Sequence, residues 1–254
     1  MCRKVDGDRA KMKVFEIYEI LDKIAPFETQ ESWDNSGLIV GSMQNKIEKI
    51  YLSLDVDSTL CDTLEENSLL ITHHPLIFKG LKELDFERYP SNIIKKLIKK
   101  NITLIAMHTN YDKAHLNQYV AEKILGYEVV EKDEFVCYFL VDDRFESFAK
   151  RVADSLKLPV LKSVGKERFI KKAAITTGSG GELIPYIKAD CFLSGDIKYH
   201  QAYEAMENGL NLIEIGHFES EIFFADSLSE NLKKFDIQAI IANSKNPFTY
   251  KTQN

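Results

Sequence analysis

Cysteine is scarce in this chain, and the few cysteines do not form a recognisable pattern. The 254 residues contain four of them, Cys2, Cys61, Cys137 and Cys191, and no Cys-x-x-Cys pair occurs. Zinc ribbons and disulfide frameworks need closely spaced cysteines, so the sequence indicates neither. Free thiols in a reducing compartment are the simpler interpretation, and we predict a cytoplasmic protein.

Long apolar runs and an excess of basic charge are also lacking. No apolar stretch approaches the roughly 18–20 residues that cross a bilayer, and the net charge is -6. An acidic chain offers no general attraction to nucleic acid or to anionic membranes, so we expect neither as a partner. The charged segment Met1–Lys11 lacks the apolar core of a signal peptide, and we predict a disordered, dispensable leader before Met12.

The apolar pattern alternates between strand and helix periods. It predicts strands over 47–56, 69–72, 102–107, 135–141, 172–177, 190–193, 210–215 and 237–242, and helices over 14–24, 91–100, 145–156, 184–188, 199–207 and 220–232. Such alternation is typical of α/β layers with largely parallel pairing. The polar stretch Glu131–Glu134 suggests a boundary, which gives a first α/β domain of residues 12–130 and 236–254 and a second of residues 131–235.

Two adjacent histidines, His73 and His74, follow the apolar run that ends at Thr72, and Pro75 comes directly after them. Neighbouring residues of a strand point to opposite faces, so a regular strand cannot aim both imidazoles at one ion. If the chain turns there, each histidine can serve one of two neighbouring ions. The alternative is a pair of structural histidines at a strand end.

Further metal-type side chains also follow predicted strands. His217 and Glu221 are four residues apart and share a face if a helix begins there, whereas Glu219 should point away. Asp112 supplies a second carboxylate. Ligands bind at the carboxyl ends of strands in open α/β sheets, and all three clusters lie at such ends. Three imidazoles and two carboxylates suit a pair of divalent transition-metal ions: zinc, manganese, iron, cobalt or nickel.

Three other polar residues are candidates for proton transfer or substrate contact. His108 precedes Asp112 in the same segment, and Asp196 and His200 are four residues apart near a predicted helix start. We regard His108, Asp196 and His200 as candidate catalytic residues, and an ordinary polar role is the alternative for each. His115 has no partner motif, so solvation is the favoured interpretation.

Two loops leave their roles open. The glycine-rich turn Thr176-Thr-Gly-Ser-Gly-Gly-Glu182 lies between a predicted strand and a predicted helix and could cradle a phosphate, although a simple tight turn is the commoner meaning. Trp33 is the sole tryptophan and lies in a polar loop after the first predicted helix. It either stacks on a base or packs against the protein.

Taken in order, these motifs resemble the Nif-three-like family, whose members are called GTP cyclohydrolase 1 type 2 homologues. The resemblance runs from about Met12 to the tail, and the chain has the length of the short form of the family. Its motifs are Ser32-Trp-Asp-Asn-Ser-Gly-Leu38, Thr72-His-His-Pro-Leu76, His108-Thr-Asn-Tyr-Asp112, Thr177-Gly-Ser-Gly180, Ser194-Gly-Asp-Ile-Lys-Tyr-His200, Gly216-His-Phe-Glu-Ser-Glu221 and Asn246-Pro-Phe-Thr249.

The resemblance implies two α/β domains with a dinuclear metal site in the cleft between them, assembled as a toroidal homohexamer. It assigns the ligands to the same five residues, His73, His74, Asp112, His217 and Glu221. It also implies a metal-dependent hydrolase that opens the imidazole ring of the guanine of GTP with metal-activated water. A metal-dependent phosphoesterase and a non-catalytic metal-binding ring protein with a regulatory or partner-binding role are the competing hypotheses.

Overall fold

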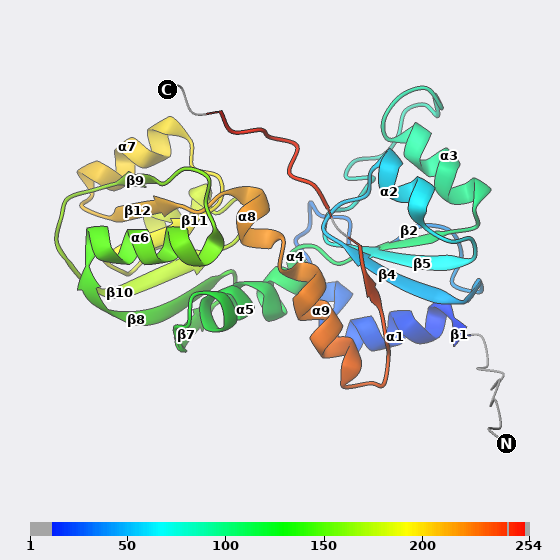
Figure 1. Cartoon of the computed structure of the whole chain (residues 1–254), viewed down its shortest axis with the longest axis horizontal. Coiled ribbons are helices and arrows are strands. Elements are labelled where there is room, and N and C mark those ends of the chain that lie inside the picture. The colour runs from blue at the N-terminus through cyan, green and yellow to red at the C-terminus, as the bar shows by residue number, and fades with distance from the viewer. Residues whose placement is uncertain (1–11, 243, 252–254) are drawn as a thin grey trace, which may run out of the picture. The chain divides into compact units, whose positions relative to one another are not determined.

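The computed structural model describes residues 12–242 and 244–251, which form two compact units (Figure 1). The first unit contains the described residues up to His108 together with Ser229–Ala242. The second contains Thr109–Leu228 and the described part of the tail after Ala242. The predicted leader Met1–Lys11 lies outside the described residues.

The first unit is built on a five-stranded sheet with the order β13-β4-β5-β6-β2. Its strands are β2 (Gly37–Val40), β4 (Lys49–Ser53), β5 (Ser68–Thr72), β6 (Thr103–Ala106) and β13 (Ile240–Ile241). All neighbours are parallel except β2, which runs antiparallel to β6. A separate pair joins β1 (Met12–Lys13) to β3 (Lys46–Ile47).

Both faces of this sheet are covered, and the central strands β4, β5 and β6 are accordingly almost entirely buried. Helices α2 (Ser58–Thr63) and α3 (Ser91–Lys99) lie on one face, and α1 (Val14–Ile24) lies on the other (Figure 1). On the α3 side, Ile93 and Leu97 pack in one cluster with Leu70 of β5 and Leu104 of β6. The lysines of α3 lie on its solvated side, as its apolar stripe predicts.

The second unit contains a six-stranded sheet with the order β7-β8-β10-β11-β12-β9. Its strands are β7 (Val129–Asp133), β8 (Val136–Arg144), β9 (Lys162–Val164), β10 (Phe169–Thr176), β11 (Cys191–Ser194) and β12 (Asn211–Glu214). The central strands β10, β11 and β12 are parallel to one another, and the outer strands are antiparallel to their neighbours.

Helices cover both faces of the second sheet as well. Tyr138 and Phe139 of β8 point to opposite faces because they are adjacent. Tyr138 belongs to the cluster that includes Ala205 of α7 (Tyr199–Glu207) and Ile184 of η4 (Gly181–Tyr186). The ring of Phe139 lies 6.4 Å from that of Phe148 in α6 (Phe145–Leu156). The predicted helices over 145–156 and 199–207 are confirmed.

One helical segment was not predicted from the sequence, and a second differs from its prediction. Residues 109–124 form one continuous helical stretch of alternating α and π turns: α4 (Thr109–Tyr111), η2 (Asp112–Leu116), α5 (Asn117–Tyr119) and η3 (Val120–Ile124). The helix predicted over 220–232 is two helices, α8 (His217–Glu221) and α9 (Phe224–Lys233). Both α8 and α9 bury residues, so the apolar pattern continues across the turn that separates them.

The division of the chain also differs from the one suggested by Glu131–Glu134. Residues Val129–Asp133 form β7, which pairs with β8 in an antiparallel hairpin inside the second unit. The stretch is polar because β7 is an edge strand whose residues are almost all exposed, not because it links two domains. The units change at His108 and Thr109 instead.

Within the described residues, no helix is both long enough and apolar enough to cross a membrane. The α/β class predicted from the sequence is confirmed, with parallel strands at the centre of each sheet.

Candidate metal centre

In the first unit, polar residues gather where three adjacent parallel strands end. Asp55 follows β4, His73 and His74 follow β5, and His108 follows β6. Because β4, β5 and β6 are neighbours that run in the same direction, their carboxyl ends meet at one edge of the sheet. The three imidazoles therefore come together: their ligand atoms all lie within 4.8 Å of one another.

The chain turns at His73 and His74, which is the condition under which both imidazoles could serve neighbouring metal ions. The backbone N–H groups of His73 and His74 both donate to the carbonyl of Leu54, at 3.2 and 3.1 Å. The hydroxyl of Thr72 donates to the carbonyl of His74 at 2.9 Å, which closes the turn. The imidazole centroids are consequently only 5.0 Å apart, although the residues are adjacent in sequence.

Hydrogen bonds at Nδ1 fix the orientation of each imidazole. Nδ1 of His73 donates to the carbonyl of Met107 at 2.8 Å. Nδ1 of His74 lies 2.7 Å from Oδ1 of Asp55, and Nδ1 of His108 lies 2.8 Å from Oδ1 of Asp34. An oxygen that only accepts holds the proton on Nδ1, so Nε2 presents a lone pair when the ring is neutral. Metal-binding histidines are oriented in this way.

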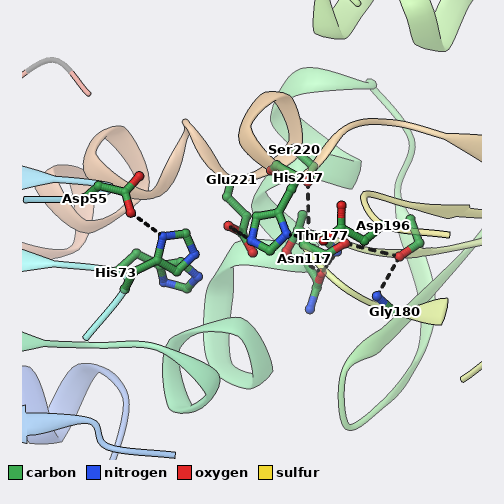
Figure 2. Close-up of polar contacts among 12 residues, drawn as sticks. Asp55, His73, Asn117, Thr177, Gly180, Asp196, His217, Ser220 and Glu221 are labelled. Carbon is green, nitrogen blue, oxygen red and sulfur yellow. Dashed lines mark hydrogen bonds and ion pairs between the residues drawn. The ribbon is translucent and has the colours of Figure 1, made fainter. Parts of the chain in front are cut away.

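The second unit repeats the arrangement at the ends of β10, β11 and β12. Gly178 follows β10, Asp196 follows β11 and His217 follows β12. The side chain of His217 lies between two carboxylates (Figure 2): Nδ1 is 2.7 Å from Oδ2 of Asp196, and Nε2 is 3.0 Å from Oε2 of Glu221. His217 and Glu221 are the first and last residues of α8, so the predicted i, i+4 relation is confirmed.

Glu221 is the central acid of this unit. It is 3% exposed, and its carboxylate lies within 4.8 Å of that of Asp112, which is also buried. Imidazole and carboxylate are the ligands that zinc and related divalent ions accept. The donor set of each unit therefore suits a divalent ion.

The two carboxylates change the protonation of His217. Burial lowers the pKa of the imidazole, but the hydrogen bonds and negative charges of Asp196 and Glu221 outweigh it and raise the pKa to about 10. In the metal-free protein the ring is therefore protonated near neutral pH, with a proton where a metal ligand needs a lone pair.

Metal uptake is accordingly expected to release a proton from His217. At about pH 8, below the raised pKa, binding of zinc should release about one proton from this residue. Calorimetry in buffers of different ionisation enthalpy measures the number. Asp196→Asn removes one of the charges that raise the pKa, so fewer protons should be released. Equal release by both proteins would contradict this origin of the proton.

Asp112 is held by the helical segment that it begins. It is the first residue of the π-helical turn η2, and such turns frequently occur at functional sites. Its carbonyl accepts from Nδ2 of Asn117 at 3.2 Å. Oδ1 of Asn117 accepts in turn from the backbone N–H of Thr177 at 2.6 Å (Figure 2). Asn117 thus ties the Asp112 segment to the glycine-rich loop.

The glycine-rich loop contacts the candidate ligands with its backbone. Gly178 has φ +60°, and its N–H donates to the hydroxyl of Ser220 at 3.0 Å. A Cβ atom at Gly178 would lie 2.0 Å from Oε1 of Glu221. At Gly195 it would lie 2.8 Å from Cα of His217. These glycines are needed for close packing against α8, which accounts for the motif without a phosphate.

Gly178→Ala is expected to impair both folding and metal binding. A residue with a side chain costs about 1–2 kcal/mol in the left-handed conformation. Overpacking against Glu221 adds about 1–3 kcal/mol. Gly126→Ala is the matched control, because Gly126 has φ +77° and open space around its Cβ position. Denaturant unfolding and metal content measure the difference, and similar losses in both variants would contradict a role for the contact with Glu221.

The remaining predicted site residues have different surroundings. Asp196 contacts His217 and not His200, so it orients an imidazole. His200 is exposed in the first turn of α7, with its ring 5.3 Å from that of Tyr199, and its catalytic role stays a prediction. His115 is half-buried, and its ring lies 5.3 Å from that of Tyr111. The carboxylate of Glu219 accepts from Nδ2 of Asn246 at 2.8 Å.

Sequence reasoning missed the residues that position the candidate ligands, namely Asp34, Asp55 and Asn117. Asp55 carried a usable signal, since it follows β4 as His73 follows β5. Asp34 lies inside the tryptophan loop, 74 residues before His108. Nothing in the local sequence predicts that pairing.

The chain belongs to the family described as Duf34/NIF3 (NGG1p interacting factor 3), which matches residues 12–247. A Campylobacter jejuni protein named GTP cyclohydrolase 1 type 2 homolog is 52% identical over 241 residues, covering 94% of this chain and 100% of that protein. A Helicobacter pylori protein named GTP cyclohydrolase 1 type 2 is 42% identical over 236 residues, covering 92% and 97%. The crystal structure of a hypothetical Staphylococcus aureus protein superposes with a TM-score of 0.84 at 27% identity, covering 95% of this chain and 100% of that one.

Proposed function

We propose that this protein is a hydrolase that depends on two divalent transition-metal ions and acts on a nucleotide. The observation that best supports this proposal is that four histidines share one orientation. His73, His74, His108 and His217 each place Nδ1 against an oxygen, the orientation in which Nε2 of a neutral imidazole can bind a metal ion. Ordinary buried histidines do not need this common arrangement at strand ends.

The proposed ligands come from both units: His73 and His74 from the first, and Asp112, His217 and Glu221 from the second. Such a site would lie in the cleft between the domains, as in the family that the sequence resembles. Glu221 is the proposed bridging ligand, because it lies next to both His217 and Asp112 in its own unit. Zinc, manganese, iron, cobalt and nickel all accept imidazole and carboxylate ligands.

The proposed reaction is opening of the imidazole ring of the guanine of GTP: one water adds to C8 and one C8–N bond breaks, and a second water breaks the remaining C8–N bond and releases C8 as formate. The names of the Campylobacter and Helicobacter relatives support this substrate. When bound, the metals supply Lewis acidity and lower the pKa of water towards neutrality. His108 is the proposed proton donor to the ring nitrogen that leaves C8, which its hydrogen bond to Asp34 supports. Asp196 acts through His217, and His200 is a second candidate proton carrier.

Turnover of GTP by the purified, metal-loaded protein tests the proposal. Formate together with a fluorescent pterin is the expected product. Inorganic phosphate without formate would instead indicate a phosphoesterase. No turnover of any nucleotide with any of the five metals would indicate a non-catalytic metal-binding ring protein with a regulatory or partner-binding role.

We further propose a cytoplasmic, toroidal homohexamer, on the resemblance to the family. Analytical ultracentrifugation measures the assembly directly. A mass equal to six chains is expected, and a stable monomer or dimer would contradict it.

A further inference from the structure

Two large aromatic side chains are exposed beside the histidine cluster of the first unit. Trp33 is 56% exposed and Phe78 is 42% exposed. Their ring centroids are 5.7 Å apart, with 38° between the planes. Both rings approach His108 edge-on, at 6.2 and 6.0 Å, with 77° between planes in each case. We call Trp33 and Phe78 the aromatic pair.

Hydrogen bonds hold the aromatic pair in place although the rings themselves are exposed. The buried carboxylate of Asp34, next to Trp33, bonds to Nδ1 of His108, and the backbone N–H of His108 donates to the hydroxyl of Ser36 at 3.0 Å. Asn35 donates from Nδ2 to the carbonyl of Ile77, next to Phe78, at 2.5 Å. The loop of Trp33 is therefore joined both to the histidine cluster and to the loop of Phe78.

Such an arrangement is poorly explained by packing alone. A tryptophan that served only the core would gain from burying its ring, at roughly 25 cal/mol per Å² of apolar surface. Here the polar neighbours are buried and the rings remain open to solvent. Aromatic faces fixed in this way stack planar rings, and base–aromatic stacking contributes substantially to nucleotide binding.

We propose that Trp33 and Phe78 form the subsite for the purine ring of the substrate. A base that stacks on this pair lies beside His108, the residue assigned to proton transfer at the ring. The pair thereby selects substrates that carry a planar heteroaromatic ring over those that offer only phosphate or sugar. The choice of a purine nucleotide rests on the proposed function, whereas the subsite itself rests on the geometry of the two rings.

The sole tryptophan makes the inference directly measurable. In the metal-loaded protein, GTP and guanosine should quench the fluorescence of Trp33, whereas inorganic triphosphate and ribose 5-phosphate should not. Trp33→Ala should weaken GTP binding by roughly 5- to 150-fold in calorimetry, the usual effect of losing one stacking ring. Trp33→Phe should restore most of the affinity. Binding of triphosphate should be the same in all three proteins, which a merely unfolded variant would not show.

Phe78→Leu should also weaken GTP binding, and Phe169→Leu is its control, because Phe169 is 50% exposed in the second unit. Absence of quenching by every purine compound, or equal quenching by triphosphate, would overturn the subsite. Turnover of GTP without quenching would overturn the subsite and leave the proposed function intact. Quenching without turnover of any nucleotide would overturn the proposed function and leave the subsite intact.

Discussion

Asp112→Ala is expected to lose metal and activity together. Its carboxylate is buried within 4.8 Å of that of Glu221, and Glu221 in turn contacts the imidazole of His217 in the same unit. Without Asp112, Glu221 is the one carboxylate left among the proposed ligands, and it cannot balance the positive charge of two divalent ions. Loss of an outer hydrogen-bonding partner typically costs 10–100-fold in metal affinity, and loss of a ligand should cost more.

One further variant separates the charge of Asp112 from its volume, and a second serves as a control. Asp112→Asn keeps the shape and should still lose metal, since an amide is a neutral ligand. Asp154→Ala, at an exposed position of α6, should behave as the parent protein. Metal content by elemental analysis and turnover of GTP are measured for each. Full metal content in Asp112→Ala would exclude Asp112 from the ligand set.

His108→Ala is expected to retain metal but to slow turnover by roughly 10²–10⁴-fold, the usual contribution of a general acid or base. Its Nδ1 is bonded to the buried Asp34, an arrangement that orients the ring for proton transfer at Nε2. His200→Ala should show the same pattern if His200 carries the proton instead. His115→Ala is the control for loss of an imidazole, because His115 belongs to none of the clusters of metal-type ligands found among the described residues.

The position of His108 allows this variant to distinguish a proton-transferring residue from a metal ligand. Its ligand atom lies within 4.8 Å of those of His73 and His74, close enough for a metal ligand. If His108→Ala loses metal as completely as Asp112→Ala does, His108 is a ligand or an indispensable partner of one. The separation between metal-binding and proton-transferring residues would then be wrong.

Many of the candidate ligands of each unit could be predicted from the sequence, because they come directly after the carboxyl ends of predicted strands. The apolar runs before His73 and His217 are β5 and β12, and parallel neighbours bring their carboxyl ends to one edge of each sheet. The turn at His73 and His74 was required by the alternation of side chains along a strand. Pro75 then indicated where β5 ends.

The rest depends on contacts that local sequence does not encode. Asp34 and His108 are 74 residues apart, and Asn117 reaches Thr177 across 60 residues. The glycine-rich loop was considered as a phosphate cradle, yet its glycines serve the close approach of Gly178 to Glu221. The polar composition of β7 reflects an edge strand that is exposed along almost its whole length, which composition alone does not distinguish from a linker.

Elemental analysis of protein prepared without chelator tests the central claim most directly. On the proposal that His73 and His74 each serve one ion and that Glu221 bridges both, we expect about two divalent ions per chain. His74→Ala should lose one ion preferentially, and Glu221→Ala should weaken both. One ion or none per chain, after reconstitution with zinc, manganese or iron, would contradict the dinuclear site.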